Sequence, residues 1–303
     1  MGAGASSGSF TSSLVTEHHD VAFFQDETSC FDIEFDEDCV DEEGCLITAA
    51  CASKLSSSEA PPNALLRLVA ESLGITSTPG LCLTSNIISL NVSSNALTSF
   101  AIPPTDPPST NLEQLNISLN PDLFASKVDL SGTANTLLFL DLSFMPVPKN
   151  NLYFALKPLN KLLYLCCDGC ELDSLIITLE GETEESLLFL PVASTLQELH
   201  LADNAFSSLE ALSGIERLSN LSILNLADND CQHDSDYRKR ILSKLPSLRK
   251  LDAFNTSTGN IKLNEVEGLR EAVEAGDSLV GANSMEKEFD SAIKGKVDIT
   301  IVG

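Results

Sequence analysis

The sequence contains no tryptophan, and its 303 residues include only three tyrosines and three methionines. Basic side chains are also scarce: 18 Lys and Arg residues stand against 44 Asp and Glu residues, and the net charge at pH 7 is −26. Phosphate binding requires clustered Lys and Arg, so this shortage argues against nucleic acid as a direct partner. The same negative charge favours solubility and steers basic partners toward the chain.

Long apolar runs are missing as well. No stretch approaches the roughly 18 apolar residues that a membrane-spanning helix needs. The first residues show neither the basic region nor the apolar region of a secretory signal. We therefore expect an intracellular, monomeric protein whose nine cysteines are reduced thiols. We place it in the cytoplasm, with the nucleus and the cilium as alternatives.

What the chain does contain is one phrase that occurs seven times. An apolar residue is followed by two free positions, a second apolar residue, one free position and a third apolar residue. The seven copies begin at Ile87, Leu112, Leu137, Leu162, Leu196, Leu221 and Leu248, in steps of 25, 25, 25, 34, 25 and 27 residues. This spacing is the signature of the leucine-rich repeat, in which each copy supplies a short strand and a return segment.

The repeats predict an α/β solenoid of about seven repeats, shaped as a horseshoe. Its concave side is a parallel sheet, and its convex side is irregular, 3₁₀ or helical. The repeat domain with its C-terminal cap is expected at 81–255, with a short helix or 3₁₀ segment at 209–218. The extra residues near Glu180 explain the 34-residue step as a surface loop. A partly helical extension is expected at 256–303.

Residues 1–60 differ from the rest in composition. They hold 13 acidic residues and one Lys, Lys54, so we expect a disordered acidic segment with embedded aromatic residues. Gly2 fits the N-myristoylation pattern, which would give a weak membrane tether. The segment 61–80 is expected to hold a capping helix over 64–73, with Asn63 as its N-cap and Gly74 as its stop.

The register also predicts which side chains are available for binding. Within each phrase, positions one, four and six point into the core, and positions three, five and eight point out of the concave face. This places Phe139, Phe144, Tyr164 and Leu119 at the middle of that face, with Asp203 and Asp228 toward its C-terminal end. Exposed aromatic clusters with polar rims mark protein contacts. The alternative is that a terminal segment of the same chain covers them.

Four copies of the phrase end in an asparagine at position nine. These residues are Asn95, Asn120, Asn204 and Asn229. An inward-pointing amide at this place can bond backbone groups that the turn leaves unpaired, so we interpret the four as structural. Met145 and Cys170 take the same position in the third and fourth copies, and Met145 predicts a distorted turn because it cannot form those bonds.

Two further patterns suggest chemistry but fit the repeat better. Cys167 and Cys170 fall on inward positions, where cysteine behaves as a small apolar residue, so no metal site or cofactor is expected. Cys166 and His200 occupy the fifth position of successive copies, which allows a thiol hydrolase as a remote alternative. The expected open surface offers no oxyanion donors, and exposed side chains of the sheet are the simpler interpretation.

The segment from Leu196 to Asp230, followed by Tyr237-Arg238 and by Leu248-x-x-Leu251-Asp252, resembles one group of intracellular leucine-rich-repeat proteins. That group has a C-terminal cap and includes the protein phosphatase 1 regulatory subunit, the U2 small nuclear ribonucleoprotein A-prime and axonemal dynein light chain 1. The resemblance is good over about 196–255 and looser over 81–195. It implies a capped solenoid that binds another protein and has no catalytic activity.

We therefore expect a non-enzymatic scaffold or regulatory subunit that binds a protein partner on its concave surface. The alternative from another class is an N-myristoylated adaptor that Gly2 tethers to a membrane.

Overall fold

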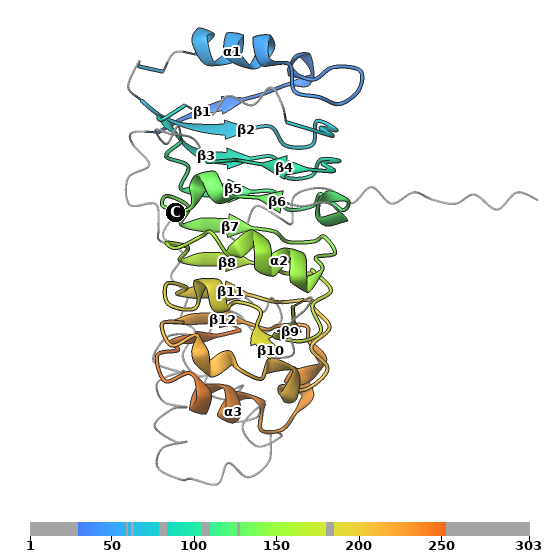
Figure 1. Cartoon of the computed structure of the whole chain (residues 1–303), viewed down its shortest axis with the longest axis vertical. Coiled ribbons are helices and arrows are strands. Elements are labelled where there is room, and N and C mark those ends of the chain that lie inside the picture. The colour runs from blue at the N-terminus through green and yellow to red at the C-terminus, as the bar shows by residue number, and fades with distance from the viewer. Residues whose placement is uncertain are drawn as a thin grey trace, which may run out of the picture.

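The computed structural model describes residues 30–58, 60–61, 64–78, 84–104, 110–125, 128–179 and 185–252. These residues form a stack of parallel strands with one long sheet (Figure 1). Its nine strands, in spatial order, are β1 (Cys30–Glu34), β2 (Leu65–Val69), β3 (Ile87–Asn91), β5 (Gln114–Asn116), β7 (Phe139–Asp141), β8 (Tyr164–Cys166), β11 (Glu198–His200), β12 (Ile223–Asn225) and β13 (Lys250–Leu251). The molecule is a leucine-rich-repeat solenoid, as the repeat predicts.

The register of the sheet follows from the apolar phrase. The fourth position of each copy pairs with the fourth position of the next, so Leu115 pairs with Leu140 and Leu140 with Leu165. These leucines and their equivalents in the other copies are at most 2% exposed. A fully buried leucine contributes about 2–3 kcal/mol, so this column of side chains contributes strongly to stability and to the alignment of the strands.

The convex side carries short and varied elements. Two small sheets are formed by β4 (Phe100–Ala101) with β6 (Val128–Asp129) and by the antiparallel pair β9 (Ile176–Thr178) and β10 (Glu185–Leu187). The β9–β10 pair lies in the 34-residue step. Helix α2 (Lys149–Leu156) lies on the convex side against β6, β9 and the 3₁₀ turn at Leu190–Val192, and its Leu152, Ala155 and Leu156 are buried. The remaining return segments are 3₁₀ turns at Glu37–Cys39, Leu123–Ala125, Ser131–Thr133, Leu190–Val192, Leu209–Leu212, Ile215–Arg217 and Asp230–His233. The turns within 209–218 confirm that prediction.

The predicted capping helix at 64–73 is wrong. Leu65–Val69 form strand β2 instead, and Leu66, Leu68 and the following Ala70 are buried with the period of two that a strand requires. Gly74 has a left-handed φ of 69°, but it follows a strand and not a helix. The repeat pattern thus begins earlier than Ile87.

The prediction of disorder over residues 1–60 is also wrong for its second half. Residues 30–58 contain strand β1, a 3₁₀ turn and helix α1 (Thr48–Ser57), which lies at the N-terminal end of the stack (Figure 1). Ile33, Phe35 and Cys51 are buried there, and Lys54 forms an ion pair with Asp36. Apolar side chains at alternating positions let this acidic segment join the sheet despite its charge.

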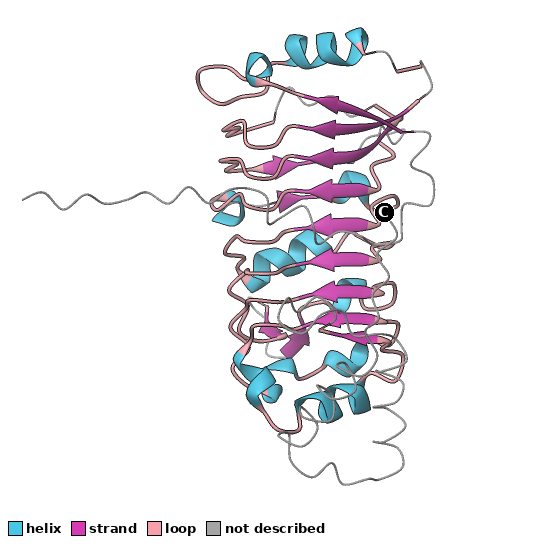
Figure 2. Ribbon diagram, turned by 180° about the vertical axis from the view of Figure 1, so that it is seen from behind, coloured by secondary structure: helices cyan, strands magenta, loops and turns pink. Residues whose placement is uncertain are grey.

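The C-terminal end of the stack is closed by α3 (Tyr237–Lys244) and β13 (Figure 2). The carboxylate of Asp252 accepts hydrogen bonds from the backbone N–H of Leu226 (2.9 Å) and the hydroxyl of Tyr237 (3.1 Å). Tyr237 and Asp252 are 4% and 2% exposed, so this contact fastens the last strand to the cap helix. The predicted extension at 256–303, the segment around Gly2 and the loop near Glu180 lie outside the described residues.

Candidate functional site

The third-position row of the concave face holds an aromatic pair at its centre. The rings of Phe139 and Tyr164 are stacked, with centroids 4.2 Å apart and planes 10° apart. The Tyr164 ring lies 5.1 Å from the imidazole of His200 on the next strand. Phe139 is half-buried, but Tyr164 is only 2% exposed. The prediction that Tyr164 is an exposed contact residue is therefore wrong.

Polar side chains beside the aromatic pair form a buried cluster. His200 Nε2 lies 2.8 Å from Glu198 Oε1, and the two residues are 4% and 2% exposed. Asp168 Oδ1 accepts the backbone N–H of Ala202 at 2.6 Å. Burial raises the pKa of the Asp168 carboxyl, while nearby His200 acts to lower it. The cluster links strands β8 and β11 and keeps Tyr164 in place.

The fifth-position row serves the backbone rather than a ligand. Asn91, Asn116, Asp141 and Asn225 each accept a hydrogen bond from the N–H two residues further along, at 2.9–3.1 Å. Such local bonds hold the turn that follows each strand. Cys166 and His200 replace this residue type in two copies, and in the His200 copy Asp168 Oδ1 accepts the N–H of Ala202 instead.

The three neighbouring thiols of Cys166, Cys167 and Cys170 are buried and offer no reactive group. Cys166 is 4% exposed, accepts a hydrogen bond from Ser143 Oγ at 2.9 Å, and has a pKa that burial raises well above 9.0. A thiol in this state is protonated and a poor nucleophile. Cys167 and Cys170 are fully buried, and all eight described cysteines are free. The expectation that Cys166 and His200 are exposed is wrong, because both pack within the polar cluster.

The eighth-position row is the accessible part of this side. It consists of Ser94, Leu119, Phe144, Gly169, Asp203 and Asp228, just beyond the carboxyl ends of the strands. All six have left-handed φ values between 51° and 61°, so each turn repeats the previous one. Phe144 is 46% exposed, Leu119 is half-buried, and Asp203 and Asp228 are exposed. Exposed apolar and acidic side chains therefore follow one another along a single line.

Backbone hydrogen bonds keep this row straight. From Ser94 to Asp203, the N–H of each eighth residue donates to the carbonyl of the seventh residue in the next copy, whereas the N–H of Asp228 donates to Gln232 Oε1 at 2.9 Å. Leu119 donates to Ser143 (2.9 Å), and Phe144 donates to Asp168 (2.7 Å). The turn at Phe144 is therefore regular, and the prediction of a distorted turn before Met145 is wrong. Met145 is 1% exposed and fills the asparagine position as an apolar side chain.

The missing side chain at Gly169 matters to the row. A Cβ atom at this position would lie 2.7 Å from Cδ1 of Phe144, well inside contact distance. The Phe144 ring therefore occupies the space that a side chain at residue 169 would need. Because Gly169 has a φ of 61°, any other residue would also be strained. Glycine thus allows the exposed aromatic ring to lie toward the acidic half of the row.

The four asparagines at position nine bond backbone groups inside the turns. Asn95 Oδ1 accepts the N–H groups of Leu73 and Ile75, and its Nδ2 donates to the carbonyl of Ala70. Asn120, Asn204 and Asn229 bond N–H groups of the copy that precedes each of them in the same way. Asn120 and Asn229 are at most 3% exposed. These bonds hold adjacent repeats together and leave the amides unavailable to a partner.

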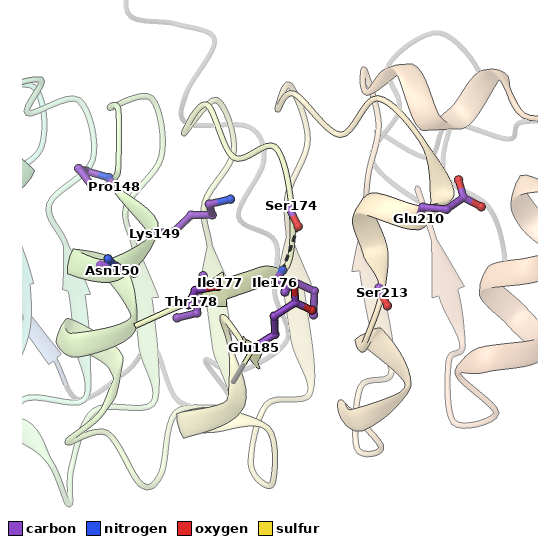
Figure 3. A pocket seen from close by; sticks show the side chains of 10 residues that line it. All are labelled: Pro148, Lys149, Asn150, Ser174, Ile176, Ile177, Thr178, Glu185, Glu210 and Ser213. Atoms are coloured by element: carbon purple, nitrogen blue, oxygen red, sulfur yellow. Dashed lines mark hydrogen bonds between the residues drawn. The ribbon is translucent and has the colours of Figure 1, made fainter. Parts of the chain in front are cut away.

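An open cavity lies on the convex side, between α2, the β9–β10 pair and the 3₁₀ turn at Leu209–Leu212 (Figure 3). It is an open groove of about 680 Å³ with polar walls, lined by Pro148, Lys149, Asn150, Ser174, Ile176, Ile177, Thr178, Glu185, Glu210 and Ser213. Lys149 pairs with Asp173 (2.7 Å) and Glu210 with Arg240 (2.8 Å). Neighbouring charges thus neutralise two of its charged groups, and the groove has little to attract a ligand.

Across the described residues, no three His, Cys, Asp or Glu side chains are arranged to hold a metal ion. Within the same residues, no helix has the length and apolar character needed to cross a membrane.

Comparison with known proteins finds similarity over part of the chain, and no family model matches it. An 83-residue stretch is 32% identical to acidic leucine-rich nuclear phosphoprotein 32 family member A of Drosophila melanogaster and covers 27% of this chain and 32% of that protein. The protein of the same name from Drosophila pseudoobscura pseudoobscura is 34% identical over 76 residues, which are 25% of this chain and 29% of that one. An uncharacterized protein of Caenorhabditis elegans is 33% identical over 87 residues, covering 27% and 19%.

The chain thus spans about a third or less of the length of the curated relatives that it matches. Among solved structures, a chain of the Drosophila melanogaster SNF/U2A' complex is similar, with a TM-score of 0.36 and 23% sequence identity. The match covers 52% of this chain and 79% of that one. The two fly relatives are leucine-rich by name, in agreement with the nine-stranded solenoid.

Proposed function

We propose that this chain is a non-enzymatic scaffold that binds a partner protein through the eighth-position row and the adjoining concave sheet. The observation that carries the proposal is the row itself: Leu119 and Phe144 present apolar surface, and Asp203 and Asp228 continue it with negative charge. Aromatic residues that stand on an exposed patch with a polar rim are typical anchors of protein interfaces.

Within this proposal the named residues have different roles. Phe144 is the anchor, and half-buried Leu119 and Phe139 extend the apolar contact. Tyr164 does not contact the partner. Its ring stacks on the ring of Phe139 and supports it. Asp203 and Asp228 are exposed and have no ion pair among the described residues, so they are available to positive charges.

The chemistry of the concave side supports binding rather than catalysis. The thiol of Cys166 is buried and protonated, and the imidazole of His200 contacts a carboxylate rather than that thiol. A nucleophile requires a thiolate or an adjacent base that faces it. The arrangement does not provide one, and we propose no cofactor.

The test compares two phenylalanines of similar exposure on opposite sides of the molecule. Phe144 is 46% exposed on the row, and Phe154 is 49% exposed on α2 of the convex side. Proteins captured from cells with wild type, Phe144→Asp and Phe154→Asp are quantified by mass spectrometry, after circular dichroism has shown that all three are folded. We expect partners that Phe144→Asp loses and Phe154→Asp keeps. Identical sets from both variants would refute the proposed surface.

The membrane-tethered adaptor is a second candidate only through the Gly2 motif. A Gly2→Ala variant and wild type are compared by cell fractionation and by metabolic labelling with a myristate analogue. Label on wild type that is absent from Gly2→Ala would establish the lipid. Equal membrane association of both would remove the lipid from the account.

For location we propose the nucleus ahead of the cytoplasm. Both fly relatives carry the word nuclear in their names, and the sequence-based prediction already included the nucleus as an alternative. Imaging of the tagged full chain in cells decides between the two compartments, and exclusion from the nucleus would overturn this part of the proposal.

A further inference from the structure

The eighth-position row has a geometry that specifies what kind of segment fits it. We infer that the partner contributes an α-helix that lies lengthwise along the row, with apolar side chains against Leu119 and Phe144 and with Lys or Arg against Asp203 and Asp228. This inference rests on the proposed function, because it names the partner of the same surface.

An added β-strand is excluded along this line by the backbone of the row. The N–H groups of Leu119, Phe144, Gly169 and Asp203 all donate to carbonyls of the next copy, at 2.7–2.9 Å. A strand that joined here would need free N–H and C=O groups along its length. Since these N–H groups are already hydrogen-bonded within the protein, a partner must be recognised through side chains.

The spacing of the row matches a helix. Neighbouring parallel strands lie about 4.8 Å apart, and one turn of an α-helix rises 5.4 Å. One repeat therefore faces one helical turn. Residues i, i+3, i+7, i+10 and i+14 of a helix share one side and would meet Leu119, Phe144, Gly169, Asp203 and Asp228 in turn. Over these four steps the helix advances about 21 Å and the row about 19 Å, so the mismatch stays near 2 Å.

An extended segment fits the same row poorly. Two repeats span about 9.6 Å, which corresponds to three extended residues at about 3.3 Å each. Side chains of an extended chain alternate between opposite sides, so residues three apart point away from each other. A segment anchored on Phe144 would therefore direct the residue at the distance of Asp203 away from the surface.

The order of side chains along the row defines the order in the helix. The apolar half comes first, at Leu119 and Phe144. Gly169 has no side chain, so the middle turn of the helix meets backbone and the edge of the Phe144 ring. The acidic half follows at Asp203 and Asp228, both exposed. The complementary helix has two apolar turns, a middle turn that approaches closely, and two turns that carry Lys or Arg.

The experiment uses a displayed library of alanine-rich helical peptides of about 20 residues, randomised at positions i, i+3, i+7, i+10 and i+14. The full chain is the bait. We expect the enriched peptides to carry apolar residues at i and i+3 and Lys or Arg at i+10 and i+14. Circular dichroism should show that they are helical when bound.

Charge reversal makes the test specific. The double variant Asp203→Lys, Asp228→Lys should weaken binding at least tenfold, and peptides with Glu at i+10 and i+14 should recover it. The matched control is Glu113→Lys, Glu185→Lys, which changes the net charge equally at two exposed sites away from the row and should leave affinity within twofold.

The outcomes separate the inference from the function that it rests on. Binders that are lost in Phe144→Asp but are indifferent to the charge reversal, or that bind without helical structure, would overturn the helix inference and keep the proposed surface. A selection that yields no binder sensitive to Phe144→Asp would overturn both. Recovery by the Glu peptides would establish the pairing.

Discussion

Asn120 is the residue whose removal most directly tests how the repeats are held together. Its side chain is fully buried. Its Oδ1 accepts the backbone N–H of Leu97 at 3.0 Å, and its Nδ2 lies 3.0–3.1 Å from the carbonyl oxygens of Val92, Ile117 and Ser118. The amide therefore joins one repeat to the next from inside the turn.

Truncation to alanine leaves only some of these backbone groups without a hydrogen-bond partner. The carbonyl of Val92 keeps a bond from Asn95 Nδ2 at 2.9 Å, and the carbonyl of Ser118 keeps the backbone N–H of Ser94 at 3.0 Å. Leu97 N–H and Ile117 C=O lose the partner that Asn120 provides.

The residue at position nine of the next copy explains why no neighbour replaces the lost donor to the carbonyl of Ile117. An asparagine in the next copy would donate to the carbonyl of Ile117, as Asn120 does to Val92, but that copy carries Met145 instead. A buried polar group without a partner costs about 1–3 kcal/mol, so two of them cost roughly 2–6 kcal/mol. We expect Asn120→Ala to lower the free energy of unfolding by this amount.

Urea denaturation followed by circular dichroism measures the effect, with Asn160→Ala as the control. Asn160 is exposed, and its side chain makes one bond, to Asn135 Oδ1 at 2.9 Å, so its truncation should cost less than about 0.5 kcal/mol. A loss below about 1 kcal/mol for Asn120→Ala would refute the reasoning, because the turn would then be stable without its internal amide.

Three further results are expected. Gly169→Ala should lower the melting temperature and change how Phe144 is exposed, because a Cβ there would meet the ring at 2.7 Å and the φ is 61°; an unchanged melting temperature would contradict this. Burial raises the pKa of Asp252 above 3.8, so the folded chain holds this proton more tightly than the unfolded chain does. The contribution of Asp252 to the free energy of unfolding therefore falls as the pH rises from about 4 through its raised pKa. Urea titrations at several pH values should show this decline for wild type and not for Asp252→Asn. Equal pH profiles of the two proteins would contradict the prediction. Alkylation of the native chain with iodoacetamide, read by mass spectrometry, should modify half-buried Cys30 before Cys166, whereas early labelling of Cys166 would show an accessible thiolate.

The fold could be predicted because the repeat phrase specifies the core directly. Every predicted copy from Ile87 to Leu248 supplies a strand, since its apolar residues alternate at the spacing that a parallel stack needs. The two N-terminal strands were missed for different reasons. In 64–73 the leucines satisfy a helical and a strand period at once, and only the neighbouring strand decides between them. In 30–34 the acidic composition concealed the alternation of Ile33 with exposed carboxylates.

The candidate surface could be predicted in outline but not in detail. The phrase fixes that Phe144, Asp203 and Asp228 share a row, because equivalent positions of a repeat stand in line. The phrase does not determine how exposed each of these side chains is. Tyr164 and His200 occupy outward positions, yet they are 2% and 4% exposed, because packing among their neighbours is not encoded in the spacing of one repeat. The left-handed turn at each eighth position likewise has no glycine signature except at Gly169.

Site-specific photo-crosslinking tests the central claim most directly. A photo-reactive amino acid is placed in the full chain instead of Phe144, and in a matched sample instead of Phe154, and the adducts formed in cells are identified by mass spectrometry. The account predicts a protein adduct at position 144 that position 154 does not form. The same adducts at both positions, or adducts at position 154 alone, would contradict a binding surface on the eighth-position row.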